Sequence, residues 1–585
     1  MSPILEWTSL TVQKNKDEYS LFEVSGKLER GRLTCLVGPS GAGKSVLLRS
    51  LAGRIETSKT AKIALVEADG TRQTLNASAY RRNHIGFVSS EDELLSSSTP
   101  AEAMEFSIAL RPRLTVEERK RSDSEQARMI DFYLNLLDLE TCKNTQYSEL
   151  ATLNQKRFST IGIEMINERK VLLLDAPLVG LSQLGAYQFI KNLKKLVAQD
   201  HNVLSGILCT LLQPSSEVLS MFDDIILMAD RGVIIYQGPV TGMADHFAKF
   251  GHVCPPHYNV SDFALFVLHS ITPAQRDDLA LVSMRKSDSL DSIILGGSRV
   301  QLQPSQRQDP AAVKVYSVSR TKQFRFLAKR EWKDVFRNWR STLVTRFVTS
   351  VLVSLVIGAV YYQIGVKVTV NSDANAIHAY RGCVLVMCCN AMFANSQTVV
   401  LSLPKQKSIF KREYSLNMYS SLVYLASKFP MEILLSAIQV LVQLIISYFL
   451  CGLQGNFATY WVVLLAVASC AESIALSISC LTTSVVSAIQ TLPIAVMPQI
   501  IFSGLIVSIK GMPKWISWIQ YICFLPYAVK LLCINEFGCA SIEQFTSNDI
   551  QCSYVLLNGF MLVFISVSFR IVALVALMFE PKSYR

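Results

Sequence analysis

Charged residues are almost missing from a long stretch in the second half of this 585-residue chain. Between Tyr414 and Lys510 the only charged side chains are Lys428, Glu432 and Glu472. Because residues 1–340 carry charges throughout, we expect a soluble half followed by a membrane half. The composition agrees, since half of all residues are hydrophobic and the mean hydropathy is +0.30.

Three further absences exclude other classes of protein. No basic stretch is interleaved with aromatic residues, so we assign the net charge of +11 to cytosolic loops and expect no nucleic acid as a partner. The 14 cysteines have no metal-ligand spacing, which argues against a zinc site. The first residues contain neither a basic region nor an apolar run, so we expect no cleavable signal peptide and a first half that stays in the cytosol.

Residues 1–275 alternate short apolar runs with polar, helix-like stretches, which predicts an α/β domain with a largely parallel sheet. Residues 276–320 are rich in Gln, Pro, Ser and charged residues, which indicates a linker. Residues 321–340 place aromatic side chains among Lys and Arg, which favours an amphipathic connecting helix at the membrane surface. An ordinary helix packed on the first domain is the alternative.

Residues 341–585 are expected to form an all-α transmembrane domain with six spans, since six apolar segments reach the roughly 20 residues that cross a bilayer. Basic residues cluster after the second segment and at the C-terminal end, whereas residues 536–552 contain no Lys or Arg. By the positive-inside rule, both termini are then cytosolic. The segments are about 342–362, 380–401, 421–450, 459–481, 485–507 and 555–578.

Two side-chain predictions follow from this topology. Cys539 and Cys552 fall on the non-cytosolic side, where disulfides persist, and we expect them to pair with each other. An intermolecular bridge and two free thiols are the alternatives. Glu472 lies in the middle of the fourth segment, where a carboxylate is costly, so we expect it to be paired with Arg346 or a neighbouring helix, or to be protonated.

A complete phosphate-binding loop lies between a predicted strand, Leu33–Val37, and a predicted helix, which is the context this motif requires. Its backbone N–H groups would wrap the phosphates of ATP, Lys44 would reach the β and γ phosphates, and Ser45 would bind Mg²⁺. Asp175, which ends the apolar run Val171–Leu174, is the expected second Mg²⁺ residue. The predicted binding residues are Gly38, Pro39, Ser40, Gly41, Ala42, Gly43, Lys44, Ser45 and Asp175.

Other stretches add to this loop: Ser159–Glu164, Pro177 with Gly180-Leu181, Gln213-Pro214, Tyr236–Pro239, Gly251–Pro255, Asp262-Phe263, Phe502–Leu505 and Asn535–Phe537. With them the chain resembles a half-transporter of the G subfamily of ABC transporters, the White and sterolin group. The resemblance covers almost the whole chain apart from the linker. It implies an ATP-binding domain followed by six spans, in a dimer that exports a lipid, sterol or other hydrophobic molecule.

The resemblance also implies that five functional positions are altered. Ser90 replaces the family's Q-loop glutamine, and Thr152-Leu153-Asn154 replaces its signature Ser-Gly-Gly. Ala176 replaces the glutamate that follows the Walker B aspartate. Ser182 replaces the D-loop aspartate, and Leu212 replaces the switch histidine. Because the loss of a general base alone costs on the order of 10²- to 10⁴-fold in rate, we expect ATP binding with little or no hydrolysis by this chain's own Walker residues.

A homodimer would have two impaired ATP sites, so the resemblance favours a heterodimer with another half-transporter of the same subfamily. It implies a multi-pass protein of the plasma membrane or of an intracellular vesicle membrane, with lipophilic cargo and membrane lipids as further partners. A regulatory subunit that does not transport, and a carrier of pigment precursors or xenobiotics, are the alternatives. The implied cargo positions in the second and fifth spans, where ordinary helix packing is the alternative, are Asn390, Phe393, Met497, Ile500 and Leu505.

Overall fold

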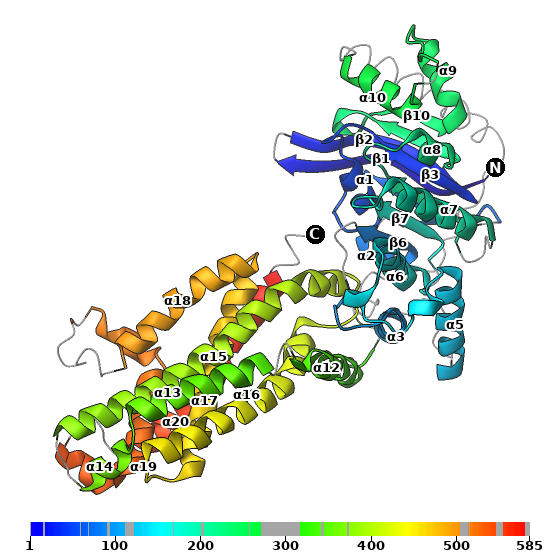
Figure 1. Cartoon of the computed structure of the whole chain (residues 1–585). Coiled ribbons are helices and arrows are strands. Elements are labelled where there is room, and N and C mark those ends of the chain that lie inside the picture. Colours follow the sequence, from blue (N-terminus) through cyan, green and yellow to red (C-terminus); the bar gives the residue numbers. More distant parts are fainter. Residues whose placement is uncertain are drawn as a thin grey trace. The chain divides into compact units, whose positions relative to one another are not determined.

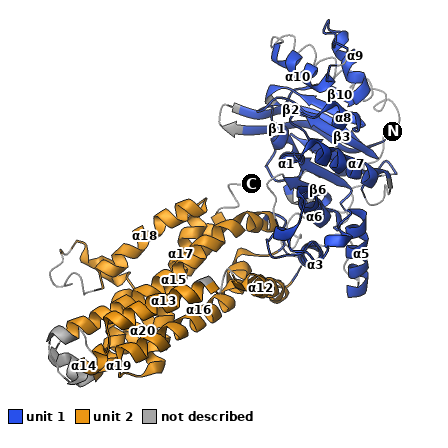
Figure 2. Cartoon of the chain, viewed as in Figure 1, with its two compact units in different colours: residues 1–318, 415–418, 584–585 blue, residues 319–414, 419–583 orange. Residues whose placement is uncertain are grey.

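The chain divides into two compact units in the computed structural model (Figure 2). The first comprises residues 1–318 with 415–418 and 584–585, and the second comprises residues 319–414 and 419–583. The structure describes residues 2–15, 18–58, 60–67, 69–75, 77–89, 94–111, 122–167, 169–199, 204–256, 258–270, 316, 318–340, 344–370, 374–503, 513, 515–545 and 554–579.

A six-stranded sheet forms the centre of the first unit, with the strand order β10-β9-β3-β8-β7-β6. Its neighbouring strands are parallel except for β10, which pairs antiparallel to β9. Every residue of β7, β8 and β9 is buried, which explains why these strands read as short, unbroken apolar runs. The strands are β3 (Arg32–Val37), β6 (Ile85–Ser89), β7 (Val171–Asp175), β8 (Gly206–Thr210), β9 (Asp224–Met228) and β10 (Ile234–Pro239).

A second, antiparallel sheet of four strands has the order β2-β1-β4-β5. Ile4, Leu5 and Trp7 of its first strand are at most 1% exposed and belong to an apolar core shared with α1. The strands are β1 (Pro3–Asn15), β2 (Glu18–Glu29), β4 (Lys62–Val66) and β5 (Arg72–Thr74).

Helices connect the strands of the first unit (Figure 1). Three of them, α3, α5 and α6, begin with a capping box in which the N-cap hydroxyl and the side chain three residues later bond each other's backbone N–H. The helices are α1 (Lys44–Leu51), α2 (Ser78–His84), α3 (Pro100–Leu110), α5 (Asp123–Leu136), α6 (Leu153–Met165), α7 (Gln183–Gln199), α8 (Ser216–Ser220), α9 (Met243–Ala248) and α10 (Val260–Ser270). Short 3₁₀ turns are η1 (Glu140–Cys142), η2 (Tyr147–Glu149), η3 (Asp230–Gly232) and η4 (Val240–Gly242).

The second unit is all-helical. Five of its described helices are long and apolar enough to cross a membrane, namely residues 346–367, 377–415, 421–451, 457–481 and 555–579. The helices are α12 (Arg320–Arg337), α13 (Thr345–Val360), α14 (Ile364–Val370), α15 (Ala374–Ser415), α16 (Ser421–Cys451), α17 (Phe457–Leu481), α18 (Val485–Ile501), α19 (Leu525–Phe545) and α20 (Val555–Phe579), with the 3₁₀ turn η7 (Ser517–Tyr521).

The predicted fold class, an α/β domain followed by an all-α membrane domain, is confirmed. The predicted fifth span, 485–507, is the apolar helix α18 as far as Ile501, and it is shorter than the other five. Residues 504–507 lie outside the described residues, as does almost all of the predicted linker. The domain boundaries themselves stay a prediction.

Polar side chains join the helices of the membrane domain. Glu472 of α17 is 1% exposed, accepts a hydrogen bond from Ser436 of α16, and has its Oε1 4.0 Å from an Arg346 nitrogen. The expectation that Glu472 contacts Arg346 and a neighbouring helix is therefore confirmed, and its protonation state stays a prediction. The Ser436 hydroxyl oxygen also lies 3.0 Å from the Oδ1 atom of Asn395 in α15, so one buried cluster links α13, α15, α16 and α17.

Ionic contacts also hold α12 within the second unit. Arg330 donates to both carboxylate oxygens of Glu413 at 2.8 and 2.9 Å, and the Tyr419 hydroxyl donates to the same carboxylate at 2.5 Å. Burial is the largest single effect and lowers the pKa of Arg330, but the charges of Glu413, Tyr419 and Glu331 together with the hydrogen bond to Glu413 raise that pKa above its ordinary value. The α12 helix is thus anchored to the end of α15 as a charged, hydrogen-bonded pair.

A buried ion pair between Arg111 at the end of α3 and Glu164 of α6 generates a stability prediction. The two side chains are 2% and 5% exposed, so replacing Glu164 by Ala leaves an uncompensated buried charge. We expect Glu164→Ala to lower the free energy of unfolding by about 3–5 kcal/mol, measured as a fall in Tm. Asp131→Ala, which removes an exposed pair with Lys143, is the control and should keep Tm near that of the wild type. Equal Tm values for the two variants would contradict the prediction.

The same pair predicts a pH dependence. Burial is the largest single effect and raises the pKa of Glu164, but the charge and hydrogen bond of Arg111, together with the charges of Arg54 and Arg169, lower that pKa below its ordinary value. A carboxyl group with a lowered pKa in the folded state stabilises the fold above its unfolded pKa, and this contribution disappears as pH falls through the folded pKa. We expect Tm to fall on acidification below about pH 4.3. Glu164→Gln cannot titrate and should show a shallower fall in a Tm series against pH.

Candidate nucleotide-binding site

The loop between β3 and α1 needs glycine for two physical reasons. A Cβ on Gly38 would lie 2.2 Å from the backbone oxygen of Met228, so no larger residue fits there. Gly43, the N-cap of α1, has a φ of +95°, in the region that favours glycine. The loop therefore presents its backbone at the start of α1, where the unbonded N–H groups of a helix attract an anion.

Lys44 is held over this loop by the backbone itself. Its Nζ donates to the carbonyl oxygens of Gly38 at 2.7 Å and Pro39 at 2.8 Å, and the residue is only 7% exposed. Burial lowers the pKa of Lys44, and the nearby carboxylate of Asp175 partly opposes that effect. The geometry keeps one ammonium group poised above the backbone donors of the loop.

Asp175 is the centre of the hydrogen-bond network beside the loop. Its Oδ1 accepts from the Ser45 hydroxyl at 2.8 Å and from the Thr210 hydroxyl at 3.0 Å. The Thr210 oxygen in turn accepts from the backbone N–H of Ala176 at 2.6 Å. Asp175 Oδ2 lies 3.7 Å from Arg49 of α1, so the carboxylate at the end of β7 contacts both α1 and β8.

Thr210 and Arg49 are site residues that the sequence analysis missed. Thr210 ends the buried run Gly206–Thr210, just as Asp175 ends Val171–Asp175, and adjacent parallel strands end at the same edge of a sheet. That pattern could have identified Thr210. Arg49 carries no such local signal, because it is an exposed helix residue whose side chain reaches Asp175 only in the folded domain.

The residues present fit a magnesium nucleotide. A hydroxyl and a carboxylate are the oxygen ligands that Mg²⁺ prefers, and this ion takes its remaining ligands from phosphate and water. In agreement, the described residues contain no cluster of three His, Cys, Asp or Glu side chains that would hold a metal alone. Ser45 and Asp175 would hold the ion, and Lys44 with the loop backbone would bind the phosphates.

The positions expected to carry catalytic side chains are occupied by apolar ones. Ala176 follows Asp175 directly, has a φ of +48° and offers only a methyl group. Leu212 lies two residues beyond Thr210 and is 53% exposed. Neither residue can take a proton from water or bind a phosphate, so the described part of this edge has no general base beside Asp175.

The altered signature Thr152-Leu153-Asn154 lies at the start of α6, where its capping box bonds the backbone N–H of Thr152 and of Gln155 within the chain. Leu153 packs against the backbone at Gly180, and the Asn154 amide donates to the Gly185 oxygen at 3.2 Å. These side chains fill the space that glycines would leave open for a close approach of another backbone or a phosphate.

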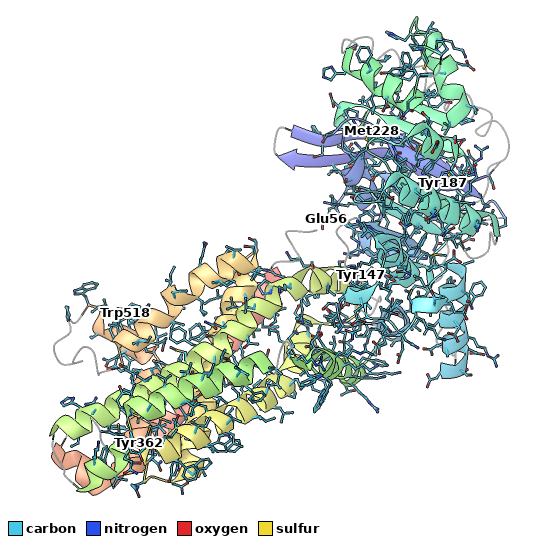
Figure 3. All side chains as sticks on the ribbon, in the orientation of Figure 1. Glu56, Tyr147, Tyr187, Met228, Tyr362 and Trp518 are labelled. Carbon is cyan, nitrogen blue, oxygen red and sulfur yellow. The ribbon has the colours of Figure 1, made fainter. Side chains whose placement is uncertain are left out.

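Exposed apolar side chains occur at two of these altered positions and on the segments that follow Ala176 and Ser182 in the chain; Tyr187, labelled in Figure 3, is on α7. Their segments are connected, since Val179 donates its N–H to the Ala176 oxygen, Leu153 packs at Gly180 and Asn154 bonds Gly185. We call these residues the exposed apolar set: Leu153 (37%), Val179 (47%), Leu184 (67%), Tyr187 (37%) and Leu212 (53%).

Several predicted positions receive no structural account. Ser90, Leu505 and Cys552 lie outside the described residues, and the side chain of Cys539 in α19 is also outside them. Ser182, the D-loop position, is described and accepts the backbone N–H of Gly185 at 3.1 Å through its hydroxyl. It therefore caps the start of α7 instead of presenting a carboxylate.

The predicted cargo positions lie on two helices of the membrane domain. On α15, Asn390 and Phe393 are half-buried, and the Asn390 Nδ2 atom is buried without a partner among the described residues. On α18, Met497 is 54% exposed and Ile500 is half-buried. No hydrogen bond among the described residues joins these two pairs. The four side chains are therefore at least partly exposed on their own helices. A cavity that they line together stays a prediction.

Three family patterns match the chain. The family described as "ABC transporter" matches residues 21–179, which contain the phosphate loop and Asp175. Two families described as "ABC-2 type transporter" match residues 212–285 and 322–537. The chain is an ABC transporter, homologous to the G family. This ABC transporter carries its ATP-binding domain first and its membrane domain second, and it is a multi-pass membrane protein.

Its relatives match over most of their length. The broad substrate specificity ATP-binding cassette transporter ABCG2 of Sus scrofa is 26% identical over 583 residues, which cover 94% of this chain and 85% of that protein. ABC transporter G family member 7 of Arabidopsis thaliana is 26% identical over 93% of this chain and 74% of its own length. A solved ATP-binding cassette of an ABC transporter covers 46% of this chain at 18% identity with a TM-score of 0.37.

The geometry of Lys44 predicts the effect of its removal. We expect Lys44→Met to weaken ATP affinity by about 10- to 100-fold, because a charge-assisted hydrogen bond contributes about 1.5–3 kcal/mol. A fluorescent ATP analogue titrated into the purified full-length chain measures the affinity. Lys62→Met, at an exposed position of β4, is the control and should bind as the wild type does. Unchanged affinity of Lys44→Met would show that the nucleotide binds elsewhere.

Proposed function

We propose that this ABC transporter binds ATP at Gly38–Ser45 and exports a lipid, sterol or other hydrophobic molecule as one half of a heterodimer. The observation that carries the proposal is that a hydrogen-bonded phosphate-binding site is followed, directly after Asp175, by an alanine. Lys44, Ser45 and Asp175 hold their positions through hydrogen bonds, while the next residue, Ala176, has no functional group. The site is suited to holding ATP and poorly suited to cleaving it.

Binding and hydrolysis place different demands on such a site. Binding uses backbone N–H groups, one ammonium and oxygen ligands, all of which this chain has. Hydrolysis also requires a group that polarises the attacking water, and Ala176 and Leu212 provide none. We therefore propose that hydrolysis at this chain's own Walker residues is absent or very slow.

The altered signature supports a heterodimer. ABC domains of the family sandwich each ATP between the Walker residues of one subunit and the signature of the other. In a homodimer, both ATP molecules would meet Ala176 on one side and Leu153 with Asn154 on the other. A partner with an intact catalytic set would restore hydrolysis at the ATP that its own Walker residues bind, against this chain's signature.

The exposed apolar set indicates how ATP bound by this chain would contribute to closure of the dimer. Leu153, Val179 and Leu212 stand at or near positions that would face the partner's ATP-binding domain in such a sandwich. Burying apolar surface at closure releases free energy in proportion to the area buried. We propose that ATP at this site, together with the exposed apolar set, stabilises the closed dimer, and that the partner's hydrolysis reopens it.

The membrane domain supports a hydrophobic cargo. Asn390 is an amide inside an apolar span whose Nδ2 donor has no partner among the described residues, and such a group favours a polar atom of a ligand or of a neighbouring helix. Ile494, Met497 and Ile501 give α18 an exposed apolar surface. We propose that Asn390 with Phe393 on α15 and Met497 with Ile500 on α18 contact the cargo, and that Leu505 closes the cavity above them.

The proposal includes the topology predicted from the distribution of basic residues. The ATP-binding domain and both termini lie in the cytosol, and Cys539 and Cys552 pair on the opposite side. The plasma membrane or an intracellular vesicle membrane is the proposed location. A regulatory subunit without transport activity is the second candidate, and the same altered catalytic positions favour it.

ATPase assays on the purified complex with a G-family partner test which of the two subunits hydrolyses ATP. We expect replacing the partner's catalytic glutamate by Gln to lower the rate by about 10²- to 10⁴-fold. Ala176→Gln in this chain is the matched variant and should leave the rate unchanged, because the position carries no catalytic group. A large loss of rate in Ala176→Gln, or a homodimer with full activity, would contradict the proposal.

A flux assay in vesicles that contain the same complex separates transport from regulation. We expect Asn390→Ala to change the rate or selectivity of cargo export, because it removes from α15 the amide whose Nδ2 atom has no partner in the described part of the chain. Asn558→Ala, which removes a buried amide from α20, is the control and should leave selectivity as it is. Identical flux for Asn390→Ala and the wild type would favour the regulatory subunit.

A further inference from the structure

Two cysteine side chains meet inside the membrane domain although they are 68 residues apart in the sequence. The sulfur of Cys383, in α15, lies 3.7 Å from the sulfur of Cys451, the last residue of α16. Both residues are 0% exposed. The contact joins two different spans, which Figure 1 labels in the second unit.

The surrounding backbone fixes this pair in place. About one turn after Cys383 in α15 and two turns before Cys451 in α16, Gln443 donates to the backbone oxygen of Met387 at 2.8 Å. Directly after Cys451, Gly452 adopts a φ of +64° and ends α16. The backbone N–H of Gln363 bonds the Leu450 oxygen at 3.0 Å, so the end of α16 is held from a second side.

The position of the pair in the membrane matters for its chemistry. Cys383 lies near the beginning of α15, whereas the basic cluster that includes Lys405 and Arg412 lies near its end. Under the proposed topology, on which this step rests, the cluster is cytosolic and the cysteine pair is at the non-cytosolic end. Arg381, two residues before Cys383, agrees with a position close to the headgroups. Disulfides form and persist on that side of a membrane.

We propose that Cys383 and Cys451 are a redox pair that forms an interhelical disulfide. A disulfide donor, either a protein or a small molecule, supplies the oxidising equivalents. Because both sulfurs are 0% exposed in the packed fold, the donor reaches them during a local opening of this end of α15 and α16. One cysteine thiolate then attacks the donor's S–S bond and releases one donor thiol. The second cysteine thiolate then attacks that mixed disulfide, forms the Cys383–Cys451 bond and releases the other donor thiol. Two thiols are oxidised, one disulfide is reduced, and the two protons go to the donor thiols.

The required movement is small. The two sulfurs must close from 3.7 Å to the bond length of about 2.05 Å. Side-chain rotation and a slight shift of the two helices suffice for a change of this size. The pair is therefore close enough to cross-link within the fold, and far enough apart to remain as thiols under reducing conditions.

The disulfide would act on the helix that carries the proposed cargo residues. Asn390 follows Cys383 by seven residues, which is close to two full turns, so both lie on nearly the same side of α15. A covalent tether between α15 and α16 at Cys383 restricts rotation of α15 about its axis. Oxidation would thus limit how far Asn390 moves between the states of a transport cycle.

Peptide mapping of the purified full-length chain tests the redox pair. Free thiols are blocked with N-ethylmaleimide under denaturing conditions, with and without prior treatment by oxidised glutathione. We expect a cross-linked peptide that contains Cys383 and Cys451, and its loss in Cys451→Ser. Cys470→Ser is the matched control, because Cys470 is buried in α17 and bonds the Leu562 oxygen, and this variant should retain the cross-link. Complete alkylation of Cys383 and Cys451 after oxidation would overturn the proposal.

An internal control detects unspecific oxidation. Cys35 and Cys209 are register partners on β3 and β8 of the ATP-binding domain and should be alkylated throughout. Cross-linking of Cys35 to Cys209 under the same treatment would overturn the proposal, since it would show that oxidation does not select Cys383 and Cys451. A separate experiment measures on which side of the membrane the cysteine pair lies. It labels Gln454→Cys, in the exposed loop after α16, with a maleimide that cannot cross membranes. Because neither readout uses transport, failure of the redox pair is distinguishable from failure of the proposed function.

Discussion

The hydrogen bonds that converge on Asp175 are the constraint on which the nucleotide site depends. A loop with three glycines has many accessible conformations, and ordering it costs backbone entropy. The carboxylate offsets this cost by accepting from Ser45 of α1 and from Thr210 of β8, which connects the loop to two strands of the central sheet. Thr210 extends the network to the backbone of Ala176. The phosphate loop, the carboxylate and the altered catalytic position therefore share one rigid frame.

This frame explains how binding and catalysis become separable. The groups that would contact phosphate are backbone atoms and Lys44, which the frame positions regardless of the side chain at residue 176. The groups that cleave ATP are side chains that extend from the same frame. They can be substituted without disturbing the hydrogen bonds around Asp175. The membrane domain uses buried polar contacts in a similar way, since Glu472 and Asn395 both contact Ser436 and hold four spans together.

Much of this architecture was predictable because it depends on local pattern. The phosphate loop, the strand before it and the buried strand that ends in Asp175 can each be recognised from a few consecutive residues. The long spans follow from hydropathy in the same manner, although α18 is shorter than its predicted segment. Glu472 was recognisable as paired, since an isolated carboxylate in a bilayer is too costly to persist.

The sequence alone determined the class of each half, the order of the two domains and the phosphate loop, because periodicity and composition act over short stretches of chain. Tertiary structure alone decided which residues meet across long separations. Thr210 reaches Asp175 only because β8 pairs with β7, and Cys383 reaches Cys451 only because α15 packs along α16. Such contacts depend on strand order, helix rotation and the burial of whole faces, which no single segment encodes.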